Sequence, residues 1–592
     1  MIERNEQKLT DTWDLSGLVK DGNEWEKGMK KLKKAFKKAP SFKGTLTSST
    51  ALLAALQYYK STSMLAERLG NWAYLMYESD STDSENMRRL GLYQAEAAAF
   101  SESFSYFTPE LLSIDEEKLR DWMKAPEYKE YRVFLNKTLR TKSHVLEEKE
   151  ERLMSLFLPV SGSAEKAFMD LNNADLDFGD IDGEKLTHGT YPVFIRSKDE
   201  SIRERAYRQY YSGYDAHKHT IADLYASSVQ EDIFTAKARG FKTSLEAALF
   251  PDKIPSKVYT SLISAVHDAF PVLHEYYRVK ARVLGKEKLH HWDCYMPMAE
   301  AVSNHHTYDE AVDIISEAVR PLGEDYRATL ISGLTTERWV DKYENKGKRS
   351  GAFSAGGYSG NPYILTNFEE NVLDSVFTLI HEGGHSMHTW YSVRSNPYMC
   401  YDYSIFEAET ASTFNENLLT HYFLTHAATK EEEAYIIGKN LDDIVATLFR
   451  QTMFAEYELI IHTLAEKKMP ITLETLRSEY RKLLEAYFGP DMIFEDVSDL
   501  EGLRVPHFYR AFYCYKYATG ISASIALSER VINGGEKERN DYLSFLCSGG
   551  SRYPLQSLKK AGVDMSTPEP VKAAAKHFST LLARFKAIKG LN

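Results

Sequence analysis

The sequence predicts a mostly α-helical protein with two or three lobes. Long segments with few prolines or glycines carry apolar residues at spacings of three and four, the period of an amphipathic helix. These segments cover residues 47–79, 84–108, 145–174, 199–239 and 255–284. The chain has 592 residues, which is too many for one hydrophobic core, and 43% of them are hydrophobic. That hydrophobic content is sufficient for a globular interior.

Two regions interrupt the helical pattern. Residues 176–196 place Asp182-Gly183 between short β-prone runs, which is typical of a hairpin. We expect a lobe boundary there, between an N-terminal helical lobe, 1–196, and a C-terminal lobe, 197–592. Residues 351–368 form a glycine-rich stretch followed by a short extended run.

The glycine-rich stretch predicts a small β region directly before the next helix. An edge strand there could line a cleft and hold an extended peptide through main-chain hydrogen bonds. A plain connecting loop is the alternative interpretation. The candidate substrate-binding residues are Gly356, Gly357, Tyr358 and Tyr363.

The most informative motif is His381-Glu382-Gly383-Gly384-His385. On a helix, a spacing of four places both imidazoles on one face, one turn apart, where they can bind one metal ion. Glu382 lies about 100° round the helix from His381, near enough to hydrogen-bond a water molecule on that metal. A Lewis acid, a water molecule and a base are what amide hydrolysis requires.

The residues around this motif favour a metal site over two unrelated surface histidines. No proline interrupts the segment from Asp374 to His388, so one helix of roughly five turns is expected. Asp374, His381, His385 and His388 fall on a polar stripe beside an apolar one. An ordinary solvated face would carry Lys and Glu instead.

A catalytic zinc usually takes three protein ligands, so a third is needed. His388 shares the face but would have to reach back along its own helix, and His388 with Tyr391 excludes the metzincin pattern. Glu409, on a second predicted helix, is the expected third ligand for one zinc ion. Glu416 lies two turns further on and is either an outer-shell partner or a solvated glutamate. The candidates for an outer-shell or alternative-ligand role are His388, Asp374 and Glu416.

Residues 506–520 form the last informative stretch. Read as one helix, they place Tyr509, Tyr513 and Tyr517 on one face, with His507 at its start. An aromatic core stripe is the alternative interpretation. Because amide hydrolysis over zinc needs donors for a developing oxyanion, we take His507 and these tyrosines as candidate catalytic residues. The sequence does not assign one tyrosine to that role.

Composition excludes several classes of function. The net charge of −12 and the pI near 5.9 argue against a nucleic-acid partner. The start of the chain is charged, and no uncharged apolar run is long enough to cross a membrane. The four cysteines are scattered, which suits free thiols in a reducing compartment. We therefore expect a cytoplasmic protein without a membrane partner.

Taken together, these motifs resemble those of the oligoendopeptidase F family, among the thimet oligopeptidase-like zinc peptidases. The resemblance covers nearly the whole chain. The matching motifs are TWDL at 12–15, RTKSH at 140–144, DIFTAKARG at 232–240, GAFS at 351–354, PYIL at 362–365, TLIHEGGHSMH at 378–388, FEAETASTFNE at 406–416, PHFY at 506–509, YATG at 517–520 and SGGS at 548–551.

The resemblance implies a two-lobed helical zinc peptidase with a deep internal channel that admits unstructured oligopeptides. It implies His381, His385 and Glu409 as zinc ligands and Glu382 as the general base. The region from His507 to the tyrosines matches the part that supplies transition-state contacts. One departure is Gly383-Gly384, where a larger apolar residue is expected before the second glycine; two adjacent glycines cost roughly 1–2 kcal/mol of helix propensity.

The expected function is therefore zinc-dependent endopeptidase activity on short oligopeptides. Glu382 would take a proton from a water activated by zinc and pass it to the leaving amine. A zinc exopeptidase, either a carboxypeptidase or a dipeptidyl carboxypeptidase, is the nearest alternative. A non-catalytic peptide-binding helical scaffold that keeps zinc for stability is a further one.

Overall fold

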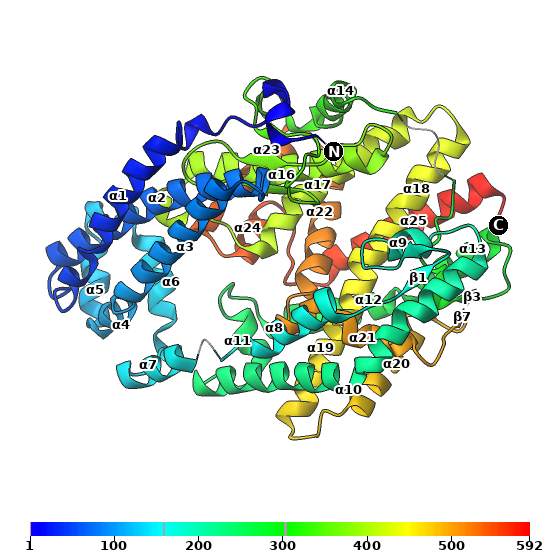
Figure 1. Cartoon of the computed structure of the whole chain (residues 1–592), viewed down its shortest axis with the longest axis horizontal. Coiled ribbons are helices and arrows are strands. Elements are labelled where there is room, and N and C mark those ends of the chain that lie inside the picture. Colours follow the sequence, from blue (N-terminus) through cyan, green and yellow to red (C-terminus); the bar gives the residue numbers. More distant parts are fainter. Residues whose placement is uncertain (1, 158–159, 301–304, 592) are drawn as a thin grey trace. The chain divides into compact units, whose positions relative to one another are not determined.

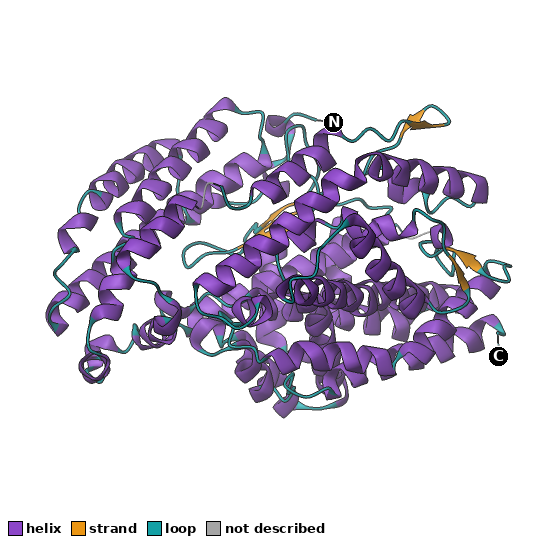
Figure 2. Ribbon diagram, turned by 90° about the horizontal axis from the view of Figure 1, so that it is seen from below, coloured by secondary structure: helices purple, strands orange, loops and turns teal. Residues whose placement is uncertain are grey.

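A computed structural model describes residues 2–157, 160–300 and 305–591 of the chain. Helices dominate these residues, and the strands are few and short (Figure 2). The predicted mostly α fold class is thus confirmed. None of the described helices combines the length and apolar character needed to cross a membrane.

The chain forms two compact units, each assembled from separate segments. Unit 1 comprises Met1–Glu148, Ser303–Tyr422 and Leu527–Val563, and unit 2 comprises Lys149–Val302, Phe423–Ala526 and Asp564–Asn592. The sequence analysis instead expected two contiguous lobes, 1–196 and 197–592. The predicted hairpin lies inside unit 2, and a boundary between independently folding domains at residue 196 stays a prediction.

Unit 1 holds an amino-terminal group of helices, a small sheet and the helix that carries the HExxH motif (Figure 1). Its elements are α1 (Gly22–Phe36), α2 (Ser49–Ser79), α3 (Ser84–Ser103), α4 (Phe107–Ser113), α5 (Glu116–Trp122), α6 (Arg132–Arg140), α14 (Tyr308–Ala318), α15 (Glu324–Leu334), β4 (Val340–Asp341), β5 (Phe353–Ala355), β6 (Tyr363–Leu365), α16 (Leu373–Ser395), α23 (Glu536–Leu546) and α24 (Pro554–Lys560). Helix α17 (Ile405–His426) lies in unit 1 except for its last turn.

Unit 2 is built mainly of helices that pack along the 39-residue helix α10. Its elements are α7 (Glu148–Phe157), α8 (Ser163–Asp170), β1 (Asp180–Ile181), β2 (Glu184–Lys185), α9 (Tyr191–Phe194), α10 (Glu200–Ala238), α11 (Ser244–Leu249), α12 (Ser256–Asp268), α13 (Phe270–Val283), β3 (Leu289–His290), α18 (Lys430–Ile444), α19 (Arg450–Glu466), α20 (Leu473–Phe488), β7 (Met492–Ile493), α21 (Glu501–Arg504) and α25 (Glu569–Lys589). Helix α22 (Tyr515–Asn533) begins in unit 2 and ends in unit 1.

Local signals account for where the long helices begin. Helix α2 starts after Ser48, whose hydroxyl accepts the backbone N–H of Ala51 at 3.3 Å. Helix α10 starts after Asp199, whose carboxylate accepts the N–H of Ser201 at 2.8 Å. Such caps satisfy N–H groups that have no partner within the helix. The helices predicted at 47–79 and 199–239 are therefore confirmed with nearly the expected ends.

Four of the predicted helical segments are interrupted. Residues 84–108 contain α3 and the first residues of α4, and residues 145–174 contain α7, α8 and a short π-helix, Leu171–Asp175. Residues 255–284 form two helices, α12 and α13, because Pro271 stands in the first turn of α13 and cannot continue the preceding helix. The single helix expected across 506–520 is wrong as well. Residues 506–509 form a short 3-10 helix, and α22 begins only at Tyr515.

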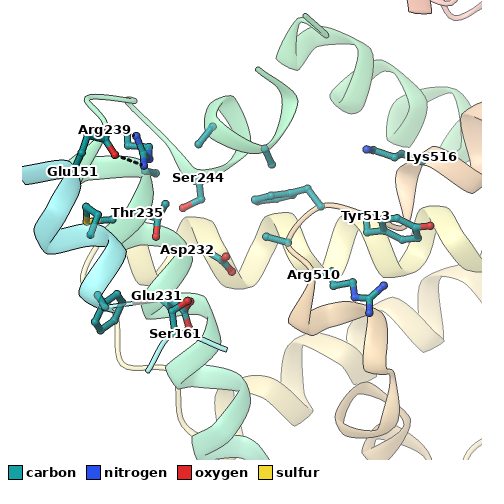
Figure 3. Close-up of a pocket in the computed structure, with 17 residues that line it drawn as sticks. Glu151, Ser161, Glu231, Asp232, Thr235, Arg239, Ser244, Arg510, Tyr513 and Lys516 are labelled. Atoms are coloured by element: carbon teal, nitrogen blue, oxygen red, sulfur yellow. Dashed lines mark hydrogen bonds and ion pairs between the residues drawn. The ribbon is translucent and has the colours of Figure 1, made fainter. Parts of the chain in front are cut away.

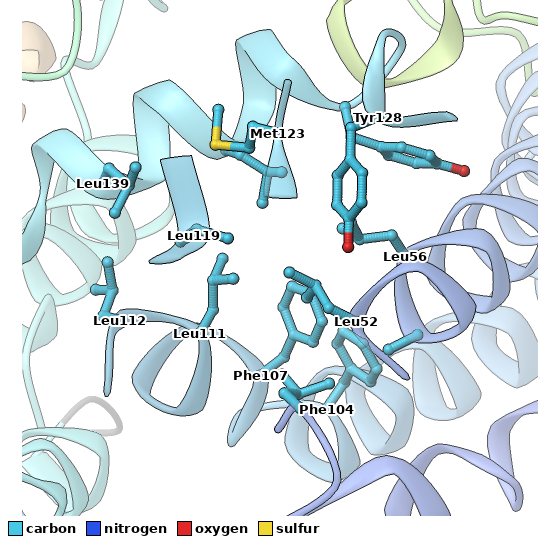
Figure 4. Close-up of a cluster of buried hydrophobic side chains, with 14 of the residues drawn as sticks. Leu52, Leu56, Phe104, Phe107, Leu111, Leu112, Leu119, Met123, Tyr128 and Leu139 are labelled. Atoms are coloured by element: carbon cyan, nitrogen blue, oxygen red, sulfur yellow. The ribbon is translucent and has the colours of Figure 1, made fainter. Parts of the chain in front are cut away.

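The core of unit 1 includes a cluster between α2, α4, α5 and α6. It buries leucines and aromatic rings such as Leu52, Phe107, Leu111 and Tyr128 (Figure 4). Removal of such side chains from water is the main force that holds these helices together.

The small sheet of unit 1 lies against helix α16. Its strand order is β4-β6-β5, with β6 parallel to β4 and antiparallel to β5. Strand β5 is therefore an edge strand. The Ser354 hydroxyl on β5 lies 2.8 Å from that of Ser386 on α16, which holds this edge beside the motif helix. The predicted small β region is present, as is the hairpin at Asp182-Gly183.

Candidate metal centre

Helices α16 and α17 approach each other closely at Gly384. A Cβ atom at this position would lie 2.7 Å from the Ala411 carbonyl oxygen and from the Ser412 Cα, both on α17. No side chain fits against backbone at that distance. Gly383 is different, because its Cβ would meet only the end of the Leu330 side chain, at 3.1 Å. The second glycine thus lets the two helices touch where the polar face of α16 meets α17.

This contact brings together His381, His385 and Glu409. The Glu409 Oε2 atom lies 3.6 Å from Nε2 of His381 and 3.7 Å from Nε2 of His385. Their ligand atoms all lie within 4.8 Å of one another, and we call these three residues the donor cluster. Among the His, Cys, Asp and Glu side chains of the described ranges, no other group of three or more could hold a metal ion. Two imidazole nitrogens and one carboxylate oxygen are a donor set that zinc takes in catalytic sites.

Glu416 orients one of these donors. Its Oε1 lies 2.8 Å from Nδ1 of His381, so Nδ1 donates its proton to Glu416 and Nε2 is the nitrogen that can bind a metal. Burial lowers the pKa of His381, but the hydrogen bond to Glu416 and the charges of Glu416, Glu382 and Glu409 together raise that pKa to about 9. Burial holds the pKa of His385 well below its usual value. A metal ion would therefore displace a proton mainly from His381.

Ser412 and Asn415 complete the surroundings on α17. The Ser412 hydroxyl donates to Glu409 Oε2 at 3.0 Å, and the Asn415 amide donates to the carbonyl of Ile380 at 3.4 Å. The first bond fixes the third donor, and the second ties α17 to the turn before His381. Neither residue stands out in the sequence, because small polar residues in a helix usually have no such role.

Glu382 has a largely buried carboxyl group beside the donor cluster. Its side chain is only 7% exposed, and burial raises its pKa to about 7, with the charge of His381 acting in the opposite direction. The backbone N–H of Ser354, on the edge strand β5, also opposes the rise. A carboxyl group with a pKa near neutrality can both accept and return a proton.

His388 and Asp374 lie outside the donor cluster. The His388 ring is fully buried and stacks on Tyr403 at 3.6 Å, and neither ring nitrogen has a hydrogen-bond partner among the described residues. Burial lowers its pKa to about 3. Asp374 is exposed in the first turn of α16. Neither side chain is placed to be an alternative ligand.

The glycine-rich segment after β5 is held by Glu67 of α2. The backbone N–H of Tyr358 donates to Glu67 Oε1 at 2.6 Å, and a Cβ on Gly357 would lie 2.7 Å from the same atom. Gly356 is exposed, whereas Tyr363 is 1% exposed and packs beside Trp13. A direct substrate contact by the Tyr363 side chain is therefore disfavoured. Glu67 was not singled out from the sequence, because its partners are about 290 residues away.

The candidate residues of 506–520 lie in unit 2, and three of them form an aromatic cluster. The ring centroids of His507 and Tyr513 are 5.6 Å apart, and the Tyr517 hydroxyl lies 3.4 Å from Nε2 of His507. Tyr509 does not join them. It is 8% exposed and stacks on Phe168 of α8 at 4.6 Å. The interrupted helix explains this, because Tyr509 no longer shares a face with Tyr513 and Tyr517.

Comparison with known protein families shows the family of this chain. A family model described as peptidase family M3 matches residues 193–577, which include the donor cluster and the aromatic cluster. The chain belongs to peptidase family M3. A second family model, described as oligopeptidase F, matches residues 110–178 of this M3 peptidase. The predicted resemblance to the oligoendopeptidase F family is confirmed, and the chain is a metalloendopeptidase that cleaves oligopeptides.

Individual relatives of this M3 peptidase align over almost their whole length. The chain is 38% identical to an oligoendopeptidase F homolog of Borreliella burgdorferi, covering 99% of this chain and 100% of the relative. It is 39% identical to oligopeptidase PepF of Bacillus subtilis, covering 98% and 87% respectively. The crystal structure of oligoendopeptidase-F from Enterococcus faecium matches with a TM-score of 0.76 and 30% identity, covering 96% and 99%. A solved structure from Chlamydophila abortus matches with a TM-score of 0.91 and 35% identity, covering 99% and 100%.

Proposed function

We propose that this M3 peptidase is a zinc-dependent endopeptidase, with one zinc ion held by His381, His385 and Glu409 and with Glu382 as general base. The observation that carries the proposal is the convergence of three donor atoms, all within 4.8 Å, beside a carboxyl group that is 7% exposed. The bond from His381 to Glu416 supports zinc, since histidine ligands commonly donate their second nitrogen to a carboxylate.

The proposed chemistry divides between the metal and Glu382. Zinc bound by these donors supplies Lewis acidity toward a water molecule and a peptide carbonyl. Ionised Glu382 takes a proton from the attacking water and then, as the acid, gives this proton to the leaving amine. The raised pKa of Glu382 suits both steps, because a carboxyl group with a pKa of about 7 can take up and release a proton at neutral pH.

The edge strand β5 supports binding of an extended peptide. It is an outer strand of the three-stranded sheet and lies beside α16 through the Ser354–Ser386 contact. An extended substrate could add to such an edge through main-chain hydrogen bonds, which require no particular side chain. Gly356, Gly357 and Tyr358 continue this edge and are proposed substrate-binding residues. Tyr363 is withdrawn from that set because its side chain is buried.

His507, Tyr513 and Tyr517 are the proposed donors to the oxyanion. They are half-buried and lie in contact with one another. Their grouping supports a shared role, because imidazole and phenol groups are suitable oxyanion donors. Tyr509 is not part of the proposal, since it packs against Phe168.

We also propose that the protein acts in the cytoplasm. All four cysteines are free, as expected for a reducing compartment.

A peptide blocked at both ends tests the endopeptidase function. An endopeptidase cuts such a peptide at an internal bond, whereas a carboxypeptidase or dipeptidyl carboxypeptidase requires a free terminal carboxylate. We expect mass spectrometry to find internal cleavage of an acetylated and amidated oligopeptide library. Cleavage confined to peptides with free carboxyl ends would contradict the proposal and favour the exopeptidase alternative.

A further inference from the structure

Phe512 in unit 2 has a backbone conformation that is unusual for an aromatic residue. Its φ angle is +57°, in the left-handed region, and among the described residues no other aromatic side chain has a positive φ. This conformation is costly for a residue with a bulky side chain, so the surrounding structure must impose it. The residue directly after it is Tyr513.

The carboxyl group of Glu458 on α19 binds the backbone at Phe512. It accepts the backbone N–H of Phe512 at 2.8 Å, and Glu458 is 0% exposed. The backbone N–H and the thiol of Cys514 also approach the carboxyl group and favour its charged form, against the larger effect of burial. The groups that donate hydrogen bonds to Glu458 thus belong to the residues on either side of Tyr513. The Phe512 ring is packed against His462, with 4.6 Å between ring centroids.

Tyr513 contacts other residues than Glu458. Its ring stacks on His507 at 5.6 Å and meets Tyr517 at 5.4 Å. It also lines a cavity of about 570 Å³ within unit 2, together with Arg510 and Lys516 and with Glu231 and Asp232 of α10 (Figure 3). That volume is in the range of ligand-binding pockets. The turn therefore places one tyrosine at both the aromatic cluster and the cavity.

We propose that Glu458 is a positioning residue of this peptidase, whose carboxyl group holds residues 510–514 in the conformation that presents Tyr513 to His507 and to the cavity. The inference rests on the proposed role of Tyr513 in catalysis. Glu458 itself is buried behind the turn and does not reach the cavity, so it acts through Tyr513. A buried acceptor with specific backbone donors fixes a segment because each donor would otherwise lie unsatisfied in the interior.

Labelling of Cys514 tests the positioning without reference to catalysis. Cys514 is 0% exposed, and alkylation of the native protein followed by mass spectrometry reports when its segment opens. We expect Glu458→Ala to speed labelling at least about tenfold, because the segment then opens locally. Glu458→Gln keeps an acceptor oxygen and should protect Cys514 as the wild type does.

Glu456→Ala is the matched control. Glu456 lies on the same helix, and its carboxylate binds the Tyr487 hydroxyl and His267 rather than the 510–514 segment. This variant should leave Cys514 protected. If Glu458→Ala does not fold, Glu458→Asp withdraws the acceptor by one methylene and should show the same change in weaker form.

Kinetics test whether the positioning matters for the reaction. For Glu458→Ala we expect kcat to fall about tenfold to a hundredfold while KM changes less than about threefold, because Tyr513 is a transition-state contact. Glu458→Gln should restore kcat. The double variant Glu458→Ala with Tyr513→Phe should be no slower than the slower single variant, since both changes remove the same contact.

The possible failures are distinguishable. A folded Glu458→Ala protein with wild-type labelling of Cys514 and wild-type kcat overturns the inference. If Cys514 is labelled but kcat is unchanged, Glu458 holds the segment without a role in the reaction, and the inference also falls. Wild-type turnover by Tyr513→Phe would instead refute the proposed catalytic contact of Tyr513, while the labelling still decides what Glu458 holds.

Discussion

Residue scale

At the scale of single residues, the metal centre depends on side chains that do not touch the metal. Glu416 is the clearest example, because its carboxylate fixes which nitrogen of His381 carries the proton. Without that bond, the imidazole can rotate or change tautomer, and the donor atom is lost part of the time. The geometry therefore leads to a prediction about affinity as well as turnover.

Glu416→Ala should weaken zinc binding by about 10–100-fold, because the histidine ligand loses its orienting acceptor. Glu416→Gln should have a smaller effect, since its amide oxygen can still accept from Nδ1. Competition with a chromophoric chelator measures both affinities. Asp374→Asn is the control, because this exposed carboxylate lies outside the donor cluster; equal affinity of Glu416→Ala and the control would refute the assigned role.

His291 in unit 2 leads to a prediction about acid stability. It is 0% exposed, with Nδ1 2.8 Å from the Tyr207 hydroxyl, and burial lowers its pKa to about 4. The unfolded chain, with a pKa near 6.5, binds the proton more readily than the folded chain. The stability contributed by neutral His291 is therefore complete above pH 6.5 and is lost as the pH falls toward 4, by about 3 kcal/mol in total.

Urea unfolding at pH 7 and pH 5 measures this effect. Between these values the wild type should lose about 2 kcal/mol more stability than His291→Gln, which cannot titrate. Parallel losses in both proteins would show that His291 is not held neutral by the fold.

The sequence anticipated the donor residues for a physical reason. A spacing of four on one helix fixes the relative position of His381 and His385 whatever the rest of the fold does. Glu409 required only the correct choice of a neighbouring helix. Ser412, Asn415 and Glu67 have no signal in the sequence, because their roles depend on partners that only the tertiary structure brings near.

Element scale

At the scale of helices, the packing of α16 explains why the motif contains Gly384. The two glycines face different neighbours, since Gly384 meets the α17 backbone and Gly383 meets the Leu330 side chain. Only the first contact sets the distance between the two helices that hold the donors. The sequence could not separate the two, because helix propensity penalises both equally.

Gly384→Ala should separate the helices, because backbone atoms 2.7 Å from the new Cβ must move. We expect a loss of stability of about 1–3 kcal/mol and at least about tenfold weaker zinc binding. Gly383→Ala is the matched variant. There the Leu330 side chain can shift by a few tenths of an ångström, and better helix propensity offsets the cost.

Thermal unfolding and zinc titration of both variants decide between these expectations. If Gly384→Ala binds zinc like the wild type, close approach of the helices is not what assembles the donors. Equal losses in both variants would point to helix flexibility, not to packing, as the reason for the glycines.

The interrupted helix at 506–520 shows where periodicity misleads. The aromatic spacing there fits a helix, yet the bond from Phe512 to Glu458 turns the chain instead. No local propensity signals a left-handed phenylalanine, because its partner is 54 residues away. Tyr509 was grouped with the other tyrosines for this reason. The break before α13 was different, since Pro271 is visible in the sequence.

Whole-molecule scale

At the scale of the whole chain, we expect the fold to persist without the metal. Helices α16 and α17 are joined by the close contact at Gly384 and by the bond from Asn415 to Ile380, and both bury apolar side chains such as Val376 and Phe414. Each unit also combines distant segments, which the sequence analysis could not foresee from local patterns. Catalysis and folding should therefore separate experimentally.

Removal of zinc with a chelator should abolish peptide cleavage while far-UV circular dichroism keeps its helical signal. The melting temperature should fall only because the free energy of metal binding to the folded protein is lost. Added zinc should restore both the melting temperature and the activity. Collapse of the helical signal on chelation would instead identify a structural metal and support the scaffold alternative.

Glu382 is the proposed carrier of the proton in a zinc-dependent hydrolysis. The most direct measurement is the turnover of Glu382→Gln on a doubly blocked oligopeptide, with bound zinc determined on the same sample. We expect a zinc content equal to that of the wild type and a fall in kcat of at least about a hundredfold, because the amide of glutamine cannot take the proton. Turnover near that of the wild type, with zinc bound, would contradict the proposed role of Glu382.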